Sequence, residues 1–211
     1  MGPRSESAVA DLLCHTGDVA DPLVVVVGGP NGAGKSTTAP RLLRGALAVR
    51  EFVNGDAIAQ GLSAFRPETV AIAAGRVMLA RLRALAGARD SFAFETTLAS
   101  RNFAPWLRTL KTQGFKVHVA FLSLPTADLA VARVAERVRQ GGHDVPEDVV
   151  RRRFVAGLSN FFTLFMPVAD SWQMFDNSGI GGPRLIAGQK PGASRVVYDD
   201  AAWRRLEEAG R

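Results

Sequence analysis

The chain has 211 residues, a length that fits one domain of ordinary size with a substantial core. Its hydrophobic content of 47% and charged content of 22% are those of a globular protein, which excludes a disordered or fibrous chain. The formal net charge of +6 comes largely from arginine, whose guanidinium group binds phosphate oxygens in pairs, so nucleotides and other polyanions are the expected ligands.

The cysteine content and the N-terminus indicate a cellular compartment. The one cysteine, Cys14, cannot form an internal disulfide, and the N-terminal residues lack an apolar signal-peptide segment. No run approaches the ~18 apolar residues of a membrane span. We therefore expect a cytoplasmic protein with no membrane partner. A nucleic-acid partner is disfavoured, because basic nucleic-acid-binding surfaces usually interleave aromatic residues with many lysines.

Strands and helices alternate in the predicted elements. An N-terminal arm at 1–22 precedes an apolar, β-branched run at 23–27, which predicts a buried parallel strand. A helix is expected at 35–47, with Pro40 near its first turn or bending it. Pro67 begins a long helix that places Val70, Ala74, Val77, Leu82 and Leu85 on one face. Further strands are predicted at 52–54, 92–94, 116–124, 172–175, 184–186 and 195–198, and further helices at 105–112, 126–140, from 146 onward and 201–208. The alternation favours an α/β fold, with a mostly parallel sheet and helices on both faces, in one domain at 23–211.

The segment from Gly29 to Ser36 matches GxxxxGK[ST], with a predicted strand before it and a predicted helix after it. Glycines let successive backbone N–H groups turn toward phosphate oxygens, and the helix N-terminus adds its positive end. We expect Lys35 at the β- and γ-phosphates, the Ser36 hydroxyl at Mg²⁺, and Thr37 on the α-phosphate side. The predicted nucleotide-binding residues are Gly29, Pro30, Asn31, Gly32, Ala33, Gly34, Lys35, Ser36 and Thr37.

Two carboxylates follow short apolar strands at the expected rim of this site. Phosphoryl transfer needs a carboxylate that positions or deprotonates the acceptor, and Asp56 and Glu95 both stand where one is required. Asp56 can also cap the helix that follows it. Glu95 can order Mg²⁺ instead of contacting the acceptor, and the residues alone leave both alternatives open.

A hydroxyl-rich turn comes directly after Glu95. Thr96, Thr97 and Arg101 can hold a polar or phosphorylated acceptor, although either threonine can instead cap a helix. Arg101 has the stronger functional signal, because guanidinium groups bind phosphate bidentately.

An arginine-dense stretch from Arg133 to Arg153 contains a Gly-Gly-His turn between two predicted helices, which is typical of a lid. Arginines that close over a transferring phosphoryl group stabilise its charge and exclude water. We expect Arg133, Arg137 and Arg153 to contact phosphate, whereas His143 is a lid contact or a structural histidine. Farther along, Asn177 lies where a nucleotide base meets the edge of the sheet, although Asp-Asn-Ser also suits a plain turn.

Five motifs in order, GGPNGAGKST, VNGDAIA, FETTLASR, RVAERVRQGGHDVPEDVVRRRF and FDNSG, resemble those of the zeta-toxin-like P-loop kinases. The resemblance covers residues 23–179 and implies a three-layer P-loop kinase fold with an arginine-rich helical lid at about 133–153. It also implies an ATP- or GTP-dependent phosphotransferase with an alcohol acceptor. Characterised relatives phosphorylate a sugar hydroxyl of UDP-N-acetylglucosamine unless an antitoxin protein blocks the nucleotide site.

On that pattern Asp56 matches the catalytic base, and Glu95 with Thr96 matches the acceptor-binding acid and hydroxyl. Lys35 matches the P-loop lysine, and Arg133, Arg137 and Arg153 match the lid arginines. The larger zeta toxins have Glu-Gly-Thr where this chain has Glu-Thr-Thr, a difference that bears on the acceptor. The alternatives are a P-loop kinase with another acceptor, such as an antibiotic, nucleoside, dinucleotide or nucleic-acid end, and an NTPase switch that transfers phosphate only to water.

Overall fold

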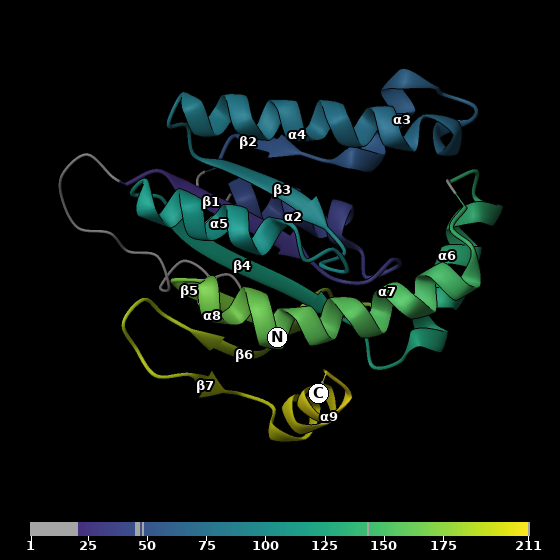
Figure 1. The fold of residues 1–211 in the computed structure, drawn as a ribbon. Helices are drawn as coiled ribbons and strands as arrows, with labels where there is room; N and C mark the ends of the chain where they lie inside the picture. The colour runs from purple at the N-terminus through teal and green to yellow at the C-terminus, as the bar shows by residue number, and fades with distance from the viewer. Residues whose placement is uncertain (1–20, 45–46, 48, 143, 211) are drawn as a thin grey trace.

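A seven-stranded sheet in the order β2-β3-β1-β4-β5-β6-β7 runs through the described part of the chain, residues 21–210 without 45, 46, 48 and 143, in this computed structural model (Figure 1). Cys14, His143 and nearly all of the predicted N-terminal arm lie outside the described residues. The strands are β1 (Leu23–Gly28), β2 (Glu51–Val53), β3 (Phe92–Thr96), β4 (Lys116–Ser123), β5 (Ser171–Asp176), β6 (Arg184–Gln189) and β7 (Val196–Val197).

The first five strands in the sheet order are parallel, and β6 and β7 are antiparallel additions at one edge. Parallel pairing requires a crossover between strands, and helical segments supply these crossovers. The helical segments are α2 (Lys35–Arg44), α3 (Gly55–Leu62), the 3₁₀ turn η1 (Pro67–Val70), α4 (Ala71–Gly87), α5 (Phe103–Thr112), α6 (Ala127–Arg139), α7 (Glu147–Asn160), the π-helical turn η2 (Phe161–Phe165), α8 (Met166–Val168) and α9 (Asp200–Gly210).

Helices cover both faces of the sheet, as the burial of β1 illustrates. Val24 and Val26 pack in the same cluster as residues of α4, α5, α7 and α9. Val25 and Val27 point to the opposite face, where they pack against α2. α6 covers the neighbouring part of that second face, through Val134 and the β4 residues beside it. The predicted α/β fold with a mostly parallel sheet between helical layers is therefore confirmed.

Several boundaries differ from the predictions. Pro40 lies at the sixth position of α2 and not in its first turn. The helix predicted from Pro67 begins as a separate 3₁₀ turn, and its packed face uses Met78, whereas Val77 is 46% exposed. The buried side of α4 carries Ala74, Met78, Leu82 and Leu85, and Val77 lies beside it on the exposed surface.

The helix predicted from residue 146 is not one regular α-helix but three helical segments in succession. α7 continues into η2 and α8, and the π-helical turn rotates the chain so that Phe161 and Phe165 are both fully buried. No helix in the described part of the chain is long and apolar enough to cross a membrane.

Candidate active site

The loop between β1 and α2 has backbone angles and clearances that only glycine satisfies at key positions. Gly29 has φ of 143°, and a Cβ there would lie 2.3 Å from the Leu122 carbonyl oxygen. Gly32 has φ of 77°, and a Cβ there would lie 2.8 Å from the Ala130 carbonyl oxygen. The loop therefore packs directly on the backbone of β4 and α6, which fixes it at the carboxyl end of the central strand.

The Lys35 side chain is buried beneath this loop and is only 6% exposed as a residue. Its Nζ donates to the Pro30 carbonyl oxygen at 3.0 Å and lies 3.7 Å from Glu95 Oε1. Burial lowers the pKa of Lys35, while the charges of Glu95 and Asp56 raise it and that of Arg137 lowers it. An anion bound beside Nζ would offset the cost of burying the ammonium group, as a phosphate does in such loops.

Glu95 lies at the end of β3, opposite Val27 of β1 in the parallel register. Ser36 Oγ donates to Glu95 Oε2 at 2.8 Å, and Asn54 Nδ2 donates to the same oxygen at 2.9 Å. Asn54 Nδ2 also lies 3.2 Å from Ser36 Oγ. The Glu95 carboxylate thus contacts the phosphate side of the site rather than the turn that follows it.

A serine hydroxyl beside a carboxylate is a donor set that suits Mg²⁺, which takes oxygen ligands. Among the residues that the structure describes, no group of three or more His, Cys, Asp or Glu could hold a metal ion. Proteins bind Mg²⁺ through one or two carboxylates together with substrate phosphates.

Asn54, which was not among the predicted site residues, is the N-cap of α3. Its Oδ1 accepts hydrogen bonds from the N–H groups of Asp56 at 2.8 Å and Ala57 at 3.2 Å. The alternative that Asp56 caps this helix is therefore wrong, and its carboxylate is exposed in the first turn. Asparagine before a Gly-Asp pair is a cap signal that could have identified Asn54.

Asp56 lines a pocket of about 180 Å³ between α3, η1 and α4. Its charge raises the pKa of Lys35, so the carboxylate stands within electrostatic reach of the phosphate-binding loop. An exposed carboxylate at the edge of a pocket near a phosphate site can accept a proton from a hydroxyl group.

The turn from Thr96 to Arg101, here called the 96–101 turn, uses its hydroxyl groups locally. Thr96 Oγ1 accepts from the Leu98 N–H at 3.2 Å, and Thr97 Oγ1 accepts from the Ala99 N–H at 3.4 Å. Leu98 is fully buried with φ of 58°, a left-handed conformation that is unfavourable for leucine. The turn is therefore held in a strained shape.

α7 supplies the contacts that hold this turn. Asn160 Nδ2 donates to the Leu98 carbonyl oxygen at 2.8 Å and to the Ala99 carbonyl oxygen at 3.2 Å. A Cβ at Gly157 would lie 2.3 Å from the Thr97 carbonyl oxygen, so only glycine allows the helix this close. No local pattern marks Gly157 or Asn160, because their partners are about 60 residues away in the sequence.

The Arg133 side chain binds backbone oxygens of the loop after β5. Its Nη1 donates to the Asn177 carbonyl oxygen and its Nη2 to the Ser178 carbonyl oxygen, each at 2.7 Å. Asn177 Nδ2 in turn donates to the Ala33 carbonyl oxygen at 2.7 Å. Arg133 and Asn177 thus join α6, the loop after β5 and the phosphate-binding loop. In this arrangement the Arg133 guanidinium is bound to backbone oxygens, and the phosphate contact expected of it stays a prediction.

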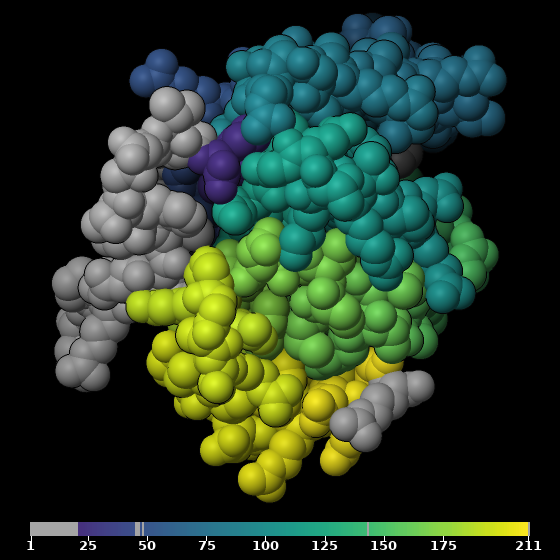
Figure 2. Space-filling view, turned by 60° about the vertical axis from the view of Figure 1, so that its left-hand side comes forward, coloured from purple at the N-terminus to yellow at the C-terminus, as the bar shows by residue number. Residues whose placement is uncertain are grey.

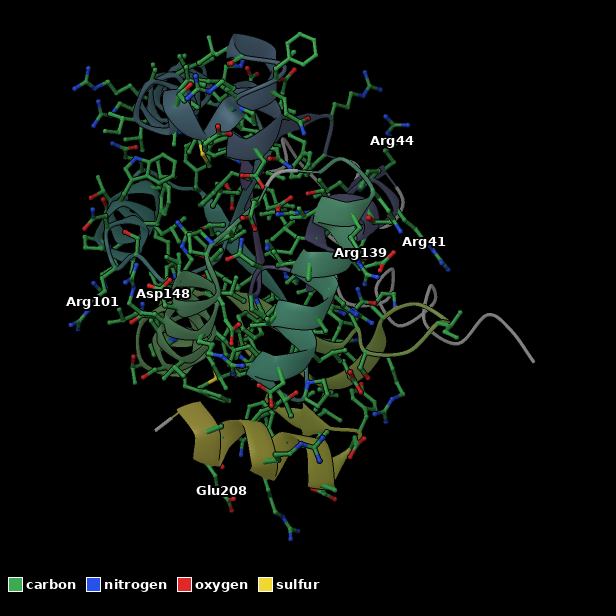
Figure 3. All side chains as sticks on the ribbon, turned by 90° about the vertical axis from the view of Figure 1, so that its right-hand side faces the viewer. Arg41, Arg44, Arg101, Arg139, Asp148 and Glu208 are labelled. Carbon is green, nitrogen blue, oxygen red and sulfur yellow. The ribbon has the colours of Figure 1, made fainter. Side chains whose placement is uncertain are left out.

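The other predicted arginines fall in different surroundings. Arg137 is half-buried and stands near enough to Lys35 to lower its pKa. Arg153 is half-buried on α7, and no hydrogen bond or ion pair joins it to another described residue. Arg101 is exposed, and its side chain points outward at the edge of the molecule (Figure 3). The acceptor contact expected of Arg101 stays a prediction.

An uncharacterized protein of Haemophilus influenzae is 31% identical over 128 residues, which cover 60% of this chain and 88% of that protein. The solved AvrRxo1-ORF1:-ORF2 structure with ATP is similar with a TM-score of 0.70 at 18% identity, over 96% of this chain and 68% of that chain.

A structure from the PezAT toxin-antitoxin system of Streptococcus pneumoniae gives a TM-score of 0.60 at 15% identity, over 99% of this chain and 98% of that chain. At these identities the two solved structures show the shared fold. The family described as AAA domain (AAA_33) matches residues 24–164, well over half of the chain and all of the phosphate-binding loop with Asp56 and Glu95. The chain therefore belongs to this AAA domain family and has its P-loop kinase-like fold.

Proposed function

We propose that this protein is an ATP- or GTP-dependent kinase that phosphorylates a hydroxyl group of a small molecule. The observation that carries the proposal is the meeting of Lys35, Ser36 and Glu95 at the end of the central strands, with the exposed Asp56 carboxylate close enough for its charge to raise the pKa of Lys35. These positions support a role for Lys35 in binding phosphate, for Ser36 and Glu95 in holding Mg²⁺, and for Asp56 in receiving a proton.

In the proposed reaction the acceptor oxygen attacks the γ-phosphorus, a new O–P bond forms, and the bond to the leaving diphosphate breaks. Asp56 takes the proton of the acceptor hydroxyl, and Lys35 binds the oxygens of the transferred group. Ser36 and Glu95 would hold Mg²⁺, which neutralises the phosphate charge when bound. We thus assign Glu95 to the metal side in place of the acceptor contact predicted for it.

Arg137 and Arg153 are proposed as the lid arginines that contact phosphate, and Arg133 and Asn177 as residues that position the nucleotide-binding loops. Thr96 and Thr97 are proposed to shape the acceptor side through the 96–101 turn. Arg101 is proposed to contact the acceptor only if the acceptor is large, because its side chain is exposed at the edge of the molecule.

The proposed acceptor is UDP-N-acetylglucosamine, on the strength of the five zeta-toxin-like motifs. A protein partner of the antitoxin class is proposed as well, because the similar solved structures are a two-protein complex and a member of a toxin-antitoxin system. The proposed location is the cytoplasm, where nucleotide and sugar nucleotide are both present.

The test is phosphoryl transfer from ATP or GTP with Mg²⁺ to UDP-N-acetylglucosamine, followed by mass spectrometry of the sugar nucleotide. Asp56→Asn should keep nucleotide affinity and lower the transfer rate by about 10²–10⁴-fold, the usual contribution of a general base. Asp148→Asn is the matched control, because Asp148 is also exposed in the first turn of a helix but lies on α7.

Transfer by Asp56→Asn at the wild-type rate would refute the assignment of the base. Absence of the phosphorylated sugar nucleotide, with another metabolite phosphorylated in cells that express the protein, would replace the acceptor and keep the kinase. Hydrolysis of ATP without transfer to any metabolite would refute the kinase in favour of an NTPase.

A further inference from the structure

A groove of about 620 Å³ lies between α4 and the start of α5, outside the site described above. The two helices run side by side on one face of the molecule (Figures 1 and 2). Met78, Leu82, Phe103 and Trp106 are among the residues that line the groove, and both aromatic rings are half-buried there. This volume and this mixture of aromatic and apolar side chains are typical of a site for a small molecule.

Two arginines of α4 also line this α4–α5 groove, and both are without an ion pair in the described part of the chain. Arg76 and Arg83 stand seven residues apart, so they lie on one side of α4, and both are exposed. By contrast Arg81, on a different side of the same helix, is paired with Glu51 at 2.7 Å. The groove therefore combines an apolar floor with a positively charged rim.

The groove adjoins both parts of the proposed acceptor site. Gly75 lines the α4–α5 groove and also the pocket that contains Asp56, and nothing lies within 4 Å of the position where a Cβ would stand. Ser100, in the 96–101 turn, and Asn102, just after it, also line the groove. A molecule whose hydroxyl group reaches Asp56 can therefore extend past Gly75 into the groove.

We propose that the α4–α5 groove binds the unreactive part of the acceptor, and that this part is a flat ring system carrying an anionic group. The ring would pack against Trp106 and Phe103, and the anion would bind Arg76 or Arg83. Ser100 and Asn102 would satisfy polar atoms at the edge of the ring. The inference rests on the proposed function, since it assigns the groove to the acceptor of that reaction.

The first experiment tests the groove without any enzymatic reaction. The probe is 8-anilinonaphthalene-1-sulfonate, an aromatic anion whose fluorescence rises on binding, titrated while saturating ADP and Mg²⁺ occupy the nucleotide site. Arg76→Glu and Arg83→Glu should each weaken binding about tenfold or more, as expected for loss of a charge-assisted contact. Arg108→Glu is the control, because Arg108 is exposed on α5 and does not line the groove.

Equal probe affinity in the two groove variants and the control would overturn the proposal. A gain of a dimer or of a bound protein chain that depends on Arg76 or Arg83, with no probe binding, would assign the groove to a macromolecular partner and also overturn it.

The second experiment connects the groove to the acceptor. UDP-N-acetylglucosamine, which has a pyrimidine ring and a diphosphate, should displace the probe from the wild-type protein and equally from the Arg108→Glu control. Probe binding that depends on Arg76 but is not displaced by the sugar nucleotide would overturn the assignment of the groove to this acceptor. Displacement without phosphorylation of the sugar nucleotide would refute the proposed reaction and leave the groove assignment standing, so the two failures are distinguishable.

Discussion

Replacement of Asn160 by alanine tests how α7 holds the 96–101 turn. The change removes the hydrogen bonds of 2.8 Å and 3.2 Å to the Leu98 and Ala99 carbonyl oxygens, made by a residue that is only 9% exposed. At a net ~1 kcal/mol for each hydrogen bond, the loss is about 2 kcal/mol. The left-handed backbone of Leu98 costs about 1–2 kcal/mol, an amount of the same size. The hydrogen bonds from Asn160 therefore offset the conformational cost at Leu98, and without them the turn should relax from its strained shape.

Two measurements separate the local effect from a general loss of structure. The free energy of unfolding should fall by about 2 kcal/mol in urea denaturation. The KM for the acceptor should rise while the Kd for nucleotide stays unchanged, because Asn160 contacts neither Lys35 nor Ser36. Asn160→Asp should behave like alanine, since a carboxylate cannot donate to the two carbonyls. Unchanged stability together with an unchanged KM in both variants would refute the role given to Asn160.

Three further predictions concern other parts of the structure. Gly157→Ala places a Cβ 2.3 Å from the Thr97 carbonyl oxygen, so it should lower the free energy of unfolding by about 1–3 kcal/mol or more, read from its thermal transition against Gly87→Ala, where nothing is close. Glu95→Gln removes the charge beside Ser36, so the Mg²⁺ concentration for half-maximal nucleotide binding should rise about tenfold, with little change in Mg²⁺-free binding. Burial lowers the pKa of His118 from 6.5 to about 4, so the unfolded chain binds the proton first as the pH falls. The contribution of neutral His118 to the free energy of unfolding is fully present above pH 6.5. As the pH falls from 6.5 to 4, the free energy of unfolding should decrease by about 3 kcal/mol, and His118→Gln should remove this part of the pH dependence.

The features that the sequence predicts best depend on residues close together in the chain. Gly29 to Ser36 carry their own signal, because the phosphate loop is a local turn joined to a strand and a helix. The alternation of strands and helices predicts a mostly parallel sheet for the same reason, since each crossover is one strand, one helix and the next strand. Even the N-cap at Thr126 is local, with its Oγ1 accepting from Leu129 N–H at 3.2 Å.

The contacts that decide the role of a side chain are not local, and sequence could not supply them. Whether Glu95 contacts metal or acceptor depends on β3 lying beside β1, a matter of strand order that brings Glu95 to Ser36 across 59 residues. Arg133 resembles other lid arginines in sequence, yet two carbonyls 44 and 45 residues away bind both ends of its guanidinium. In these two cases the motif identified a functional residue, but only the tertiary fold shows which atoms its side chain contacts.

α7 shows how far such tertiary contacts reach beyond any motif. Arg153, Gly157 and Asn160 lie at spacings of four and three residues, so they share one face of the helix. The last two hold the 96–101 turn, while Arg151, near the start of the helix, is bound to Asp128 of α6 at 2.6 Å. The same helix is thus connected to the arginine-bearing helix at one end and to the acceptor turn at the other. For this reason a variant such as Asn160→Ala is informative about the acceptor even though Asn160 lies in none of the sequence motifs.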